Sequence, residues 1–518
     1  MGSGGMGTGG APSCQQNETM ACDTGLKGAC SPGKATCNAN GSSYGSCVPD
    51  VAPNAMPEDC TKVGDENCDG VACSDCVWSF LAGDGNNVFP TAVAIDASGN
   101  IFVTGGFTGT LKFLNKSNNT SVVLNSAGSS STLLAKFNPS GEVLWAKAFG
   151  DIDSGAFTES LAIDAAGDVL IAGQSYGAAD FGSGAFTALG AAAAYVAKFD
   201  ATGVPQWSRQ LGSSGNGNPT DATTVAVDSN GDVVLGGWLN GTMTIGAIKF
   251  PTALGYDVFV AKLAGPTGAV TWAKQFKEES GTTNVDQFLG SLTTDSSNNI
   301  FMTGFFSGTI LLNTILSTIG GGADQDVFVA KLDPKGTPAW SVAFGTMSND
   351  APKDIAVDGS GNVLVTGTVG GSTNFGGGLV SISGNAIQNA FIVEYTNASA
   401  YVNAKIFPAD SGVGLDTDEA DDIYLSGVTT RLIDLGGGPL PYGGGKDMFL
   451  VKLDANLAHL WSKDFGDAKN QFSQALRYDT SSKSVILLGA VNGNIDFGTG
   501  SLTAVPMNGN LSLAKFQP

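Results

Sequence analysis

The chain has 518 residues, more than a single hydrophobic core needs, and 74 of them are glycine. Its 25 Lys and Arg against 47 Asp and Glu give a net charge of −22, which makes nucleic acids and anionic membrane surfaces poor partners. No run of about 20 apolar residues occurs, so no transmembrane segment is expected.

Residues 1–13 are rich in glycine and are predicted to form a flexible tether. Such a tether typically follows a removed export signal or a lipid anchor, so we expect this N-terminus to be a processed or truncated one. Residues 14–76 then contain all nine cysteines and few apolar residues, which predicts a small, loop-rich domain held by disulfides. A zinc site is the alternative, from Cys60, Cys68, Cys73 and Cys76.

Disulfides form in oxidising compartments, so the cysteines favour a secreted or outer cell-surface protein over a periplasmic one. Nine is an odd number, which leaves one thiol free, paired between molecules or separated from a partner upstream.

The cysteine-rich segment also contains the loop GDENCDG. Asp65, Asn67 and Asp69 alternate as oxygen ligands would around a calcium ion, and Gly70 permits the sharp turn. Asp75 lies one residue short of the position where an EF-hand has its bidentate glutamate. The pattern predicts a weak calcium site, and the alternative is an Asx-rich turn without metal.

Residues 77–518 repeat one pattern seven times. It runs from an apolar residue and Asp through a Gly-containing turn into an apolar strand, as in AIDASGNIFVTGG. The anchor aspartates, about 58 to 68 residues apart, are Asp96, Asp164, Asp228, Asp295, Asp358, Asp416 and Asp479. They are expected to cap turns through their own backbone rather than to bind metal.

The second half of each repeat pairs a VAKL-like strand with a strand that carries tryptophan. The tryptophans, expected to pack between blades, are Trp145, Trp207, Trp272, Trp340 and Trp461, while Asn403 takes this place in one repeat. Two hairpins per repeat give a four-stranded blade with strands A to D. The last repeat lacks its fourth strand, and an extra one lies at 77–83 with Trp78. The sequence therefore predicts an all-β, seven-bladed β-propeller closed by this N-terminal strand.

The repeats, with GNIFVTG and VFVAKLD, resemble SBBP repeats, a seven-bladed β-propeller family. Segment 22–70, with PEDC and DENCDG, resembles the cysteine-rich metal-binding motif named after MopE, a copper-binding surface protein. These resemblances imply a bacterial, exported protein. The copper chemistry of MopE is not expected here, because His459 is the only histidine and lies in a predicted C–D turn.

The D–A connections are polar and variable, so the face that carries them and the B–C connections is predicted to bind ligand. Trp238, out of register with the other tryptophans, is a candidate ligand platform there. The candidate acidic rim consists of Asp84, Asp151, Asp153, Asp350, Asp410 and Asp467.

These features predict a binding or scaffold protein that presents a propeller face to a glycan or protein partner, on a calcium-stiffened stalk. The alternative is a carboxylate-dependent polysaccharide hydrolase or lyase at the rim. No spacing selects a catalytic pair, so the sequence favours a protein that is not an enzyme.

Overall fold

The computed structural model describes residues 76–83, 87–115, 117–128, 130–150, 155–186, 189, 192–212, 219–279, 285–320, 324–382, 388–504 and 509–517, and the backbone of three short strands before them. Those three strands form one antiparallel sheet: β1 (Thr19–Asp23), β2 (Pro32–Thr36) and β3 (Val48–Pro49). By internal contacts the chain divides into two compact units, one ending at Val77 and the other beginning at Trp78. The residues that the structure describes include no helix long and apolar enough to cross a membrane.

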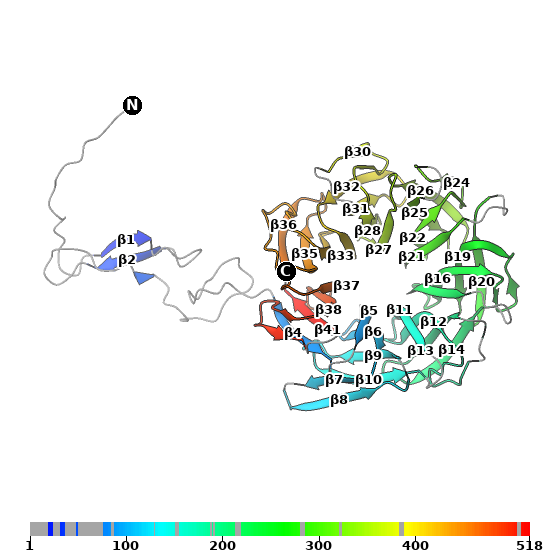
Figure 1. Ribbon diagram of the computed structural model, residues 1–518, viewed down its shortest axis with the longest axis horizontal. Coiled ribbons are helices and arrows are strands. Elements are labelled where there is room, and N and C mark those ends of the chain that lie inside the picture. The colour runs from blue at the N-terminus through cyan, green and yellow to red at the C-terminus, as the bar shows by residue number, and fades with distance from the viewer. Residues whose placement is uncertain are drawn as a thin grey trace. The chain divides into compact units, whose positions relative to one another are not determined.

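The second unit is a ring of seven four-stranded antiparallel sheets, seen along its axis in Figure 1. In the order A to D, blade 1 consists of β5 (Val88–Ile95), β6 (Ile101–Phe107), β9 (Ser131–Phe137) and β10 (Val143–Phe149). Blade 2 consists of β11 (Ala156–Ile163), β12 (Val169–Ser175), β13 (Ala193–Phe199) and β14 (Pro205–Leu211). Blade 3 consists of β15 (Thr220–Val227), β16 (Val233–Gly241), β19 (Ala253–Leu263) and β20 (Val270–Phe276).

Blades 4 to 7 follow the same order around the ring. Blade 4 consists of β21 (Gln287–Thr294), β22 (Ile300–Ser307), β25 (Gln325–Leu332) and β26 (Pro338–Phe344). Blade 5 consists of β27 (Ala351–Val357), β28 (Val363–Val369), β31 (Asn389–Tyr395) and β32 (Tyr401–Phe407). Blade 6 consists of β33 (Ser411–Thr417), β34 (Ile423–Thr429), β35 (Asp447–Leu453) and β36 (His459–Phe465). Blade 7 consists of β37 (Gln471–Asp479), β38 (Ser484–Val491), β41 (Asn510–Phe516) and β4 (Cys76–Ala82).

Blade 7 joins the two ends of the propeller sequence. Its outermost strand β4 lies beside β41, so the sheet order is β37-β38-β41-β4. Apolar side chains seal the next seam, where Ile486 and Leu511 of blade 7 pack with Val103 and Leu133 of blade 1. The predicted seven-bladed ring and its closure by the N-terminal strand are therefore confirmed, and closure leaves the ring without a broken seam.

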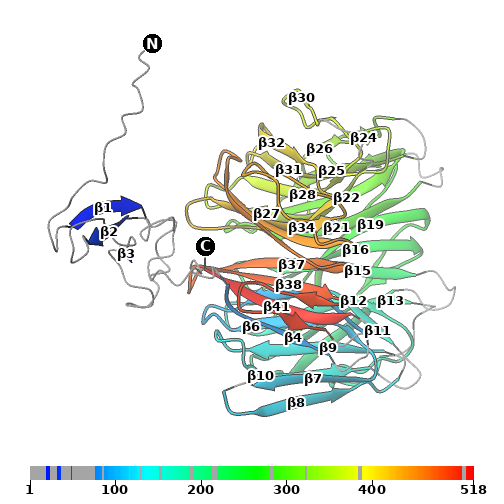
Figure 2. The ribbon, with the colours of Figure 1, turned by 60° about the vertical axis from the view of Figure 1, so that its left-hand side comes forward.

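Short hairpins extend the B–C connection of five blades. They are β7 (Thr110–Asn115) with β8 (Thr120–Asn125), β17 (Thr244–Ile245) with β18 (Ile248–Lys249), β23 (Thr309–Leu311) with β24 (Ile315–Ser317), β29 (Thr373–Asn374) with β30 (Leu379–Val380), and β39 (Asn494–Ile495) with β40 (Leu502–Thr503). The longest of them, β7 with β8, lies at the outer edge of the ring (Figure 2). The two middle strands of each blade, B and C, are almost completely buried, which matches their continuous apolar runs.

The repeated aspartates cap the A–B turns, as predicted. Asp96 Oδ1 accepts backbone hydrogen bonds from Ser98 (3.0 Å) and Asn100 (2.9 Å), and Lys136 of strand C lies 3.3 Å from its Oδ2. One anchor was assigned wrongly: in blade 6 the cap is Asp418, which accepts from the amides of Ala420 and Asp422, both at 3.0 Å. Asp416 lies two residues earlier, on the A strand.

At five of the seven seams an aligned tryptophan links one blade to the next. Trp207 is 6% exposed, and its Nε1 donates to the Gly265 carbonyl in the C–D turn of blade 3 at 2.9 Å. The ring packs so closely on Gly268 of that turn that a Cβ there would lie 2.6 Å from it. Trp78, Trp145, Trp272 and Trp340 make the equivalent hydrogen bond to the C–D turn of the blade that follows.

Asn403 preserves this link without an indole. Its Nδ2 donates to the Asn456 carbonyl in the C–D turn of blade 6 at 2.9 Å. Leu457 of that turn is 4% exposed and occupies the position that glycine takes opposite most of the tryptophans. Its φ of +61° is one that glycine adopts readily and leucine does not. A small side chain on strand D is thus matched by a large one in the facing turn.

Candidate functional site

The seven A strands surround a central channel, and in Figure 1 the labels β5, β11, β21, β27, β33 and β37 lie nearest the middle of the ring. A cavity of about 400 Å³ lies in this channel. Its lining residues come from the C-terminal ends of the A strands, for example Ile95, Ile163, Val227 and Thr294. The cavity therefore lies toward the A–B turns, on the opposite side from the D–A connections.

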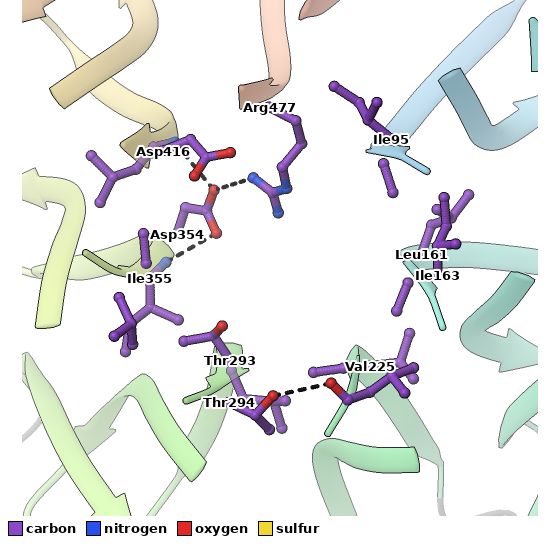
Figure 3. A pocket seen from close by; sticks show the side chains of 18 of the residues that line it. Ile95, Leu161, Ile163, Val225, Thr293, Thr294, Asp354, Ile355, Asp416 and Arg477 are labelled. Carbon is purple, nitrogen blue, oxygen red and sulfur yellow. Dashed lines mark hydrogen bonds and ion pairs between the residues drawn. The ribbon is translucent and has the colours of Figure 1, made fainter. Parts of the chain in front are cut away.

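One side of the cavity is charged, as Figure 3 shows for Asp354, Asp416 and Arg477. Arg477 Nη1 of blade 7 lies 3.0 Å from Asp354 Oδ2 of blade 5, so this ion pair spans blade 6. Asp354 Oδ2 also accepts a hydrogen bond from the backbone amide of Leu415 at 3.2 Å. The ion pair thus binds three consecutive blades together at the channel wall.

Asp416 is held by backbone amides on two blades. Its Oδ2 accepts from Tyr478 at 2.8 Å and its Oδ1 from Thr417 at 2.9 Å. Burial raises the pKa of Asp416, although the charge of Arg477 acts in the opposite direction. Burial alone would lower the pKa of Arg477, but the charges of Asp354 and Asp416 raise it. The three groups therefore form one coupled electrostatic unit.

The rest of the cavity wall is neutral. Ile95, Leu161, Ile163 and Val225 lie across the cavity from the charged side (Figure 3). The cavity is therefore apolar on one side and densely hydrogen bonding on the other, an arrangement typical of small-molecule sites.

The D–A face carries a different feature, four aromatic side chains that we call the aromatic cluster. They are Trp238, Tyr256, Phe288 and Phe305, and each is partly exposed. Ring centroids are 5.1 Å apart for Trp238 and Tyr256, 4.9 Å for Tyr256 and Phe288, and 5.0 Å for Phe288 and Phe305. Trp238 also lies edge-on to Phe288 at 5.7 Å, so blades 3 and 4 share one continuous aromatic surface.

A buried acid borders the aromatic cluster. Asp221 is directly opposite Trp238 in the pairing of β15 with β16, and it is 8% exposed. Burial, helped by the nearby charge of Glu159, raises the pKa of Asp221 to about 8. Asp221 is therefore mostly protonated at neutral pH, and its Oδ1 is buried without a hydrogen-bond partner among the described residues.

The residues of the predicted acidic rim that the structure describes are engaged by neighbouring groups. Asp350 is fully buried and accepts hydrogen bonds from the amides of Thr346 and Gly370. Asp410 pairs with Arg431 at 2.6 Å. Asp467 accepts from the amides of Lys469 and Asn494, both at 2.8 Å. Outside the described residues lie Asp84, Asp151 and Asp153, and the calcium-loop residues Asp65, Asn67, Asp69 and Asp75.

Within the described part of the chain, no group of three or more His, Cys, Asp or Glu is placed to hold a metal ion. His459 begins β36, and its Nε2 lies 2.9 Å from Ser462 Oγ, so its neighbour is another residue of the same strand. Sequence reasoning missed the channel unit because Asp354 and Arg477 each occur in a single repeat. Comparing the seven repeats position by position would have shown both as departures from small or uncharged residues.

The similarity of this chain to three known proteins is distant. No protein-family model matches the chain. An alignment of 195 positions, which covers 31% of this chain, is 26% identical to an uncharacterized WD repeat-containing protein of Acanthamoeba polyphaga mimivirus and spans 13% of that protein's length. Among solved structures, the Dos1 propeller is 9% identical with a TM-score of 0.40, over 84% of this chain and 94% of that one. A quinohemoprotein alcohol dehydrogenase of Comamonas testosteroni is 10% identical with a TM-score of 0.42, over 85% and 76% of the respective chains.

Proposed function

We propose that this protein is a binding or scaffold module that presents the D–A face of its propeller to a glycan or protein partner. The aromatic cluster is the observation that supports this role. Partly exposed aromatic rings on a rigid scaffold supply contact area at a low cost in conformational entropy. The partner that we favour is a glycan, because sugar rings stack on aromatic surfaces of this kind.

The proposed setting is the bacterial cell surface or medium. It rests on the nine cysteines of residues 14–76, the glycine-rich tether and the loop of Asp65, Asn67 and Asp69, which would bind calcium outside cells. In this proposal the N-terminal segment is a calcium-stiffened stalk and the ring is the part that recognises the partner. The hydrolase alternative gains no support from Asp350, Asp410 and Asp467, since each is engaged by neighbouring groups.

A glycan array with the full chain tests the proposal, followed by titration of the best ligand. We expect the Trp238→Ala, Phe288→Ala double variant to bind at least about tenfold more weakly, as loss of two aromatic anchors predicts. Phe89→Ala is the matched control. Phe89 holds the position of Phe288 in blade 1 and is 51% exposed, but it has no ring neighbour among the described residues. Equal affinity of the parent and the double variant would show that the aromatic cluster is not the ligand surface.

A further inference from the structure

The channel unit breaks the sevenfold repeat at three consecutive blades. Two residues before the turn aspartate, blades 1 to 5 have Ala94, Ala162, Ala226, Thr293 and Ala356, whereas blades 6 and 7 have Asp416 and Arg477. Four residues before it, blade 5 has Asp354 where blades 2, 3 and 4 have Ser160, Thr224 and Ser291. Opposite charges thus enter the channel at neighbouring positions of an otherwise neutral ring.

The ring itself does not require these charges. Ser160 Oγ accepts a hydrogen bond from the Val225 amide of the next blade at 3.1 Å, and Thr224 Oγ1 accepts from the Leu292 amide at 3.1 Å. Asp354 accepts from the equivalent amide of blade 6, so it performs a link that a hydroxyl performs elsewhere. Burying a carboxylate and a guanidinium where neutral groups suffice is costly, which indicates another use for them.

Arg477 is positioned to use its remaining donors. Its side chain is 38% exposed and lines the cavity. Nη1 bonds Asp354 and the Leu476 carbonyl, while Nη2 and Nε make no hydrogen bond with the described residues. Blade 6 has Gly414 at the intervening position, where a Cβ would lie 2.7 Å from the Leu476 nitrogen. This close approach of blades 6 and 7 places Arg477 within reach of blade 5.

We propose that the channel cavity binds a neutral polyhydroxylated molecule, a sugar of one or two rings, through Arg477 and Asp416, with Asp354 holding the guanidinium in place. Hydroxyl oxygens accept from Nη2 and Nε of Arg477, and hydroxyl hydrogens go to the remaining lone pairs of Asp416. Asp354 is a positioning residue, because its Oδ1 already accepts from Ser291 Oγ and the Ile355 amide and its Oδ2 from Arg477 and the Leu415 amide. The apolar wall at Ile95 and Ile163 contacts the C–H groups of the sugar ring. The volume of about 400 Å³ falls within the usual range for small-molecule sites, about 300–1,000 Å³.

The mixed charge selects against ions. An anion meets two carboxylates beside the guanidinium, and a cation meets the guanidinium between the carboxylates, so the attraction that either ion gains is offset in part by repulsion. A hydroxyl group both donates and accepts, and it therefore suits paired acidic and basic groups. This proposal goes beyond the role of the D–A face and stands without it, because the two surfaces share no residue.

Saturation-transfer NMR and calorimetry on the full chain test the proposal, with glucose, galactose and N-acetylglucosamine as probes. Glucuronate and glucosamine serve as the charged counterparts. All measurements are made in the parent and in the Trp238→Ala, Phe288→Ala background, which separates channel binding from binding at the D–A face. We expect the neutral sugars to bind equally in both backgrounds and at least tenfold more tightly than the charged ones.

The decisive variant is Asp354→Ser, Asp416→Ala, Arg477→Ala, which installs residues that other blades already have at these positions. It should keep the melting temperature of the parent and bind neutral sugars at least about tenfold more weakly, since each hydrogen bond lost involves a charged group. If this variant does not fold, the near-isosteric Asp416→Asn replaces it, with the same expected loss. Absence of neutral-sugar binding in the parent, undiminished binding in the folded variant, or preference for a charged sugar would each overturn the proposal.

Discussion

The exchange of a tryptophan and a glycine for Asn403 and Leu457 makes a quantitative prediction about the seam between blades 5 and 6. At the equivalent seam between blades 2 and 3, Trp207 packs against Gly268, and a Cβ on that glycine would lie 2.6 Å from the indole. The seam between blades 5 and 6 has the small residue, Asn403, on strand D of blade 5 and the large one, Leu457, which is 4% exposed, in the C–D turn of blade 6. Asn403→Trp and Leu457→Gly together would convert this seam into the common type.

Each single change should destabilise the ring. Asn403→Trp forces an indole against Leu457, and overpacking of this kind costs about 1–3 kcal/mol. Leu457→Gly empties buried space at a cost of about 2–5 kcal/mol, reduced by about 1–2 kcal/mol because glycine adopts the φ of +61° without strain. In the double variant the indole fills the space that the leucine leaves and its Nε1 can donate to the Asn456 carbonyl. We therefore expect the free energy of unfolding of the double variant to lie within about 1 kcal/mol of that of the parent. This corresponds to a coupling energy between the two substitutions of about 1–3 kcal/mol.

Urea unfolding followed by far-UV circular dichroism measures this double-mutant cycle without interference from the added tryptophan. The control is Leu457→Gly with Asn403→Phe, which fills the space but lacks the donor and should recover less stability. If the losses of unfolding free energy in the two single variants sum to the loss in the double variant within about 0.5 kcal/mol, size compensation across this seam is refuted.

Three further predictions follow from the same structure. Deleting residues 77–83 should cause aggregation or a large fall in melting temperature, because strand β41 of blade 7 becomes an exposed edge. Deleting residues 1–75 should leave the ring folded. Equal melting temperatures of the parent and the 77–83 deletion would contradict closure of the ring by β4. Burial, with the nearby charge of Asp447, raises the pKa of Asp464 to about 7, so the folded state binds the extra proton and the contribution of Asp464 to stability should fall as pH rises from about 4 to about 7. Asp464→Asn should make the fall in melting temperature between pH 4 and 8 smaller than in the parent, and it should melt higher than the parent at pH 8. Residues 14–76 should bind one calcium ion with a Kd of about 10⁻⁴–10⁻³ M. Calorimetric titration of the Asp69→Ala variant, with its disulfides intact, should show no heat of calcium binding. If the parent segment also shows no heat of binding up to about 10 mM calcium, the motif is a plain turn without metal.

Most of the ring could be predicted from the sequence because the same physical requirement recurs in every blade. Each A–B turn needs an acceptor for its amides, each inner strand needs an apolar run, and each seam needs a donor such as Trp207 or Trp340. Because each pattern recurs from blade to blade, it could be distinguished from a chance match in the sequence. The one anchor assigned wrongly lay in the sequence LDTDEADD, where Asp416, Asp418 and Asp422 all fit a turn motif and only backbone geometry distinguishes them.

The candidate sites were harder to predict because they depend on contacts between repeats. Asp354 and Arg477 are 123 residues apart, and no local pattern joins them. Trp238 stood out from the repeat, but its neighbours Tyr256 and Phe288 had no such signal, since aromatic residues are common in strands. Asp350 looked like a loop acid, whereas the fold buries it among backbone amides.

Departures from the repeat fall into two physical kinds. Those at a seam or beside an A–B turn are compensated locally. Asn403 donates to the Asn456 carbonyl across a seam, and within blade 5 Glu394, which replaces the usual strand C lysine, accepts from Asn362 at 2.8 Å. Such pairs restore what the ring needs and therefore concern stability. The channel departures at Asp354 and Arg477 restore nothing that the neutral blades lack, because those blades hold their seams with hydroxyls and alanines. A departure that the scaffold does not need is the better indicator of a ligand, which is why the channel unit carries our further proposal and the unusual seam of blade 6 does not.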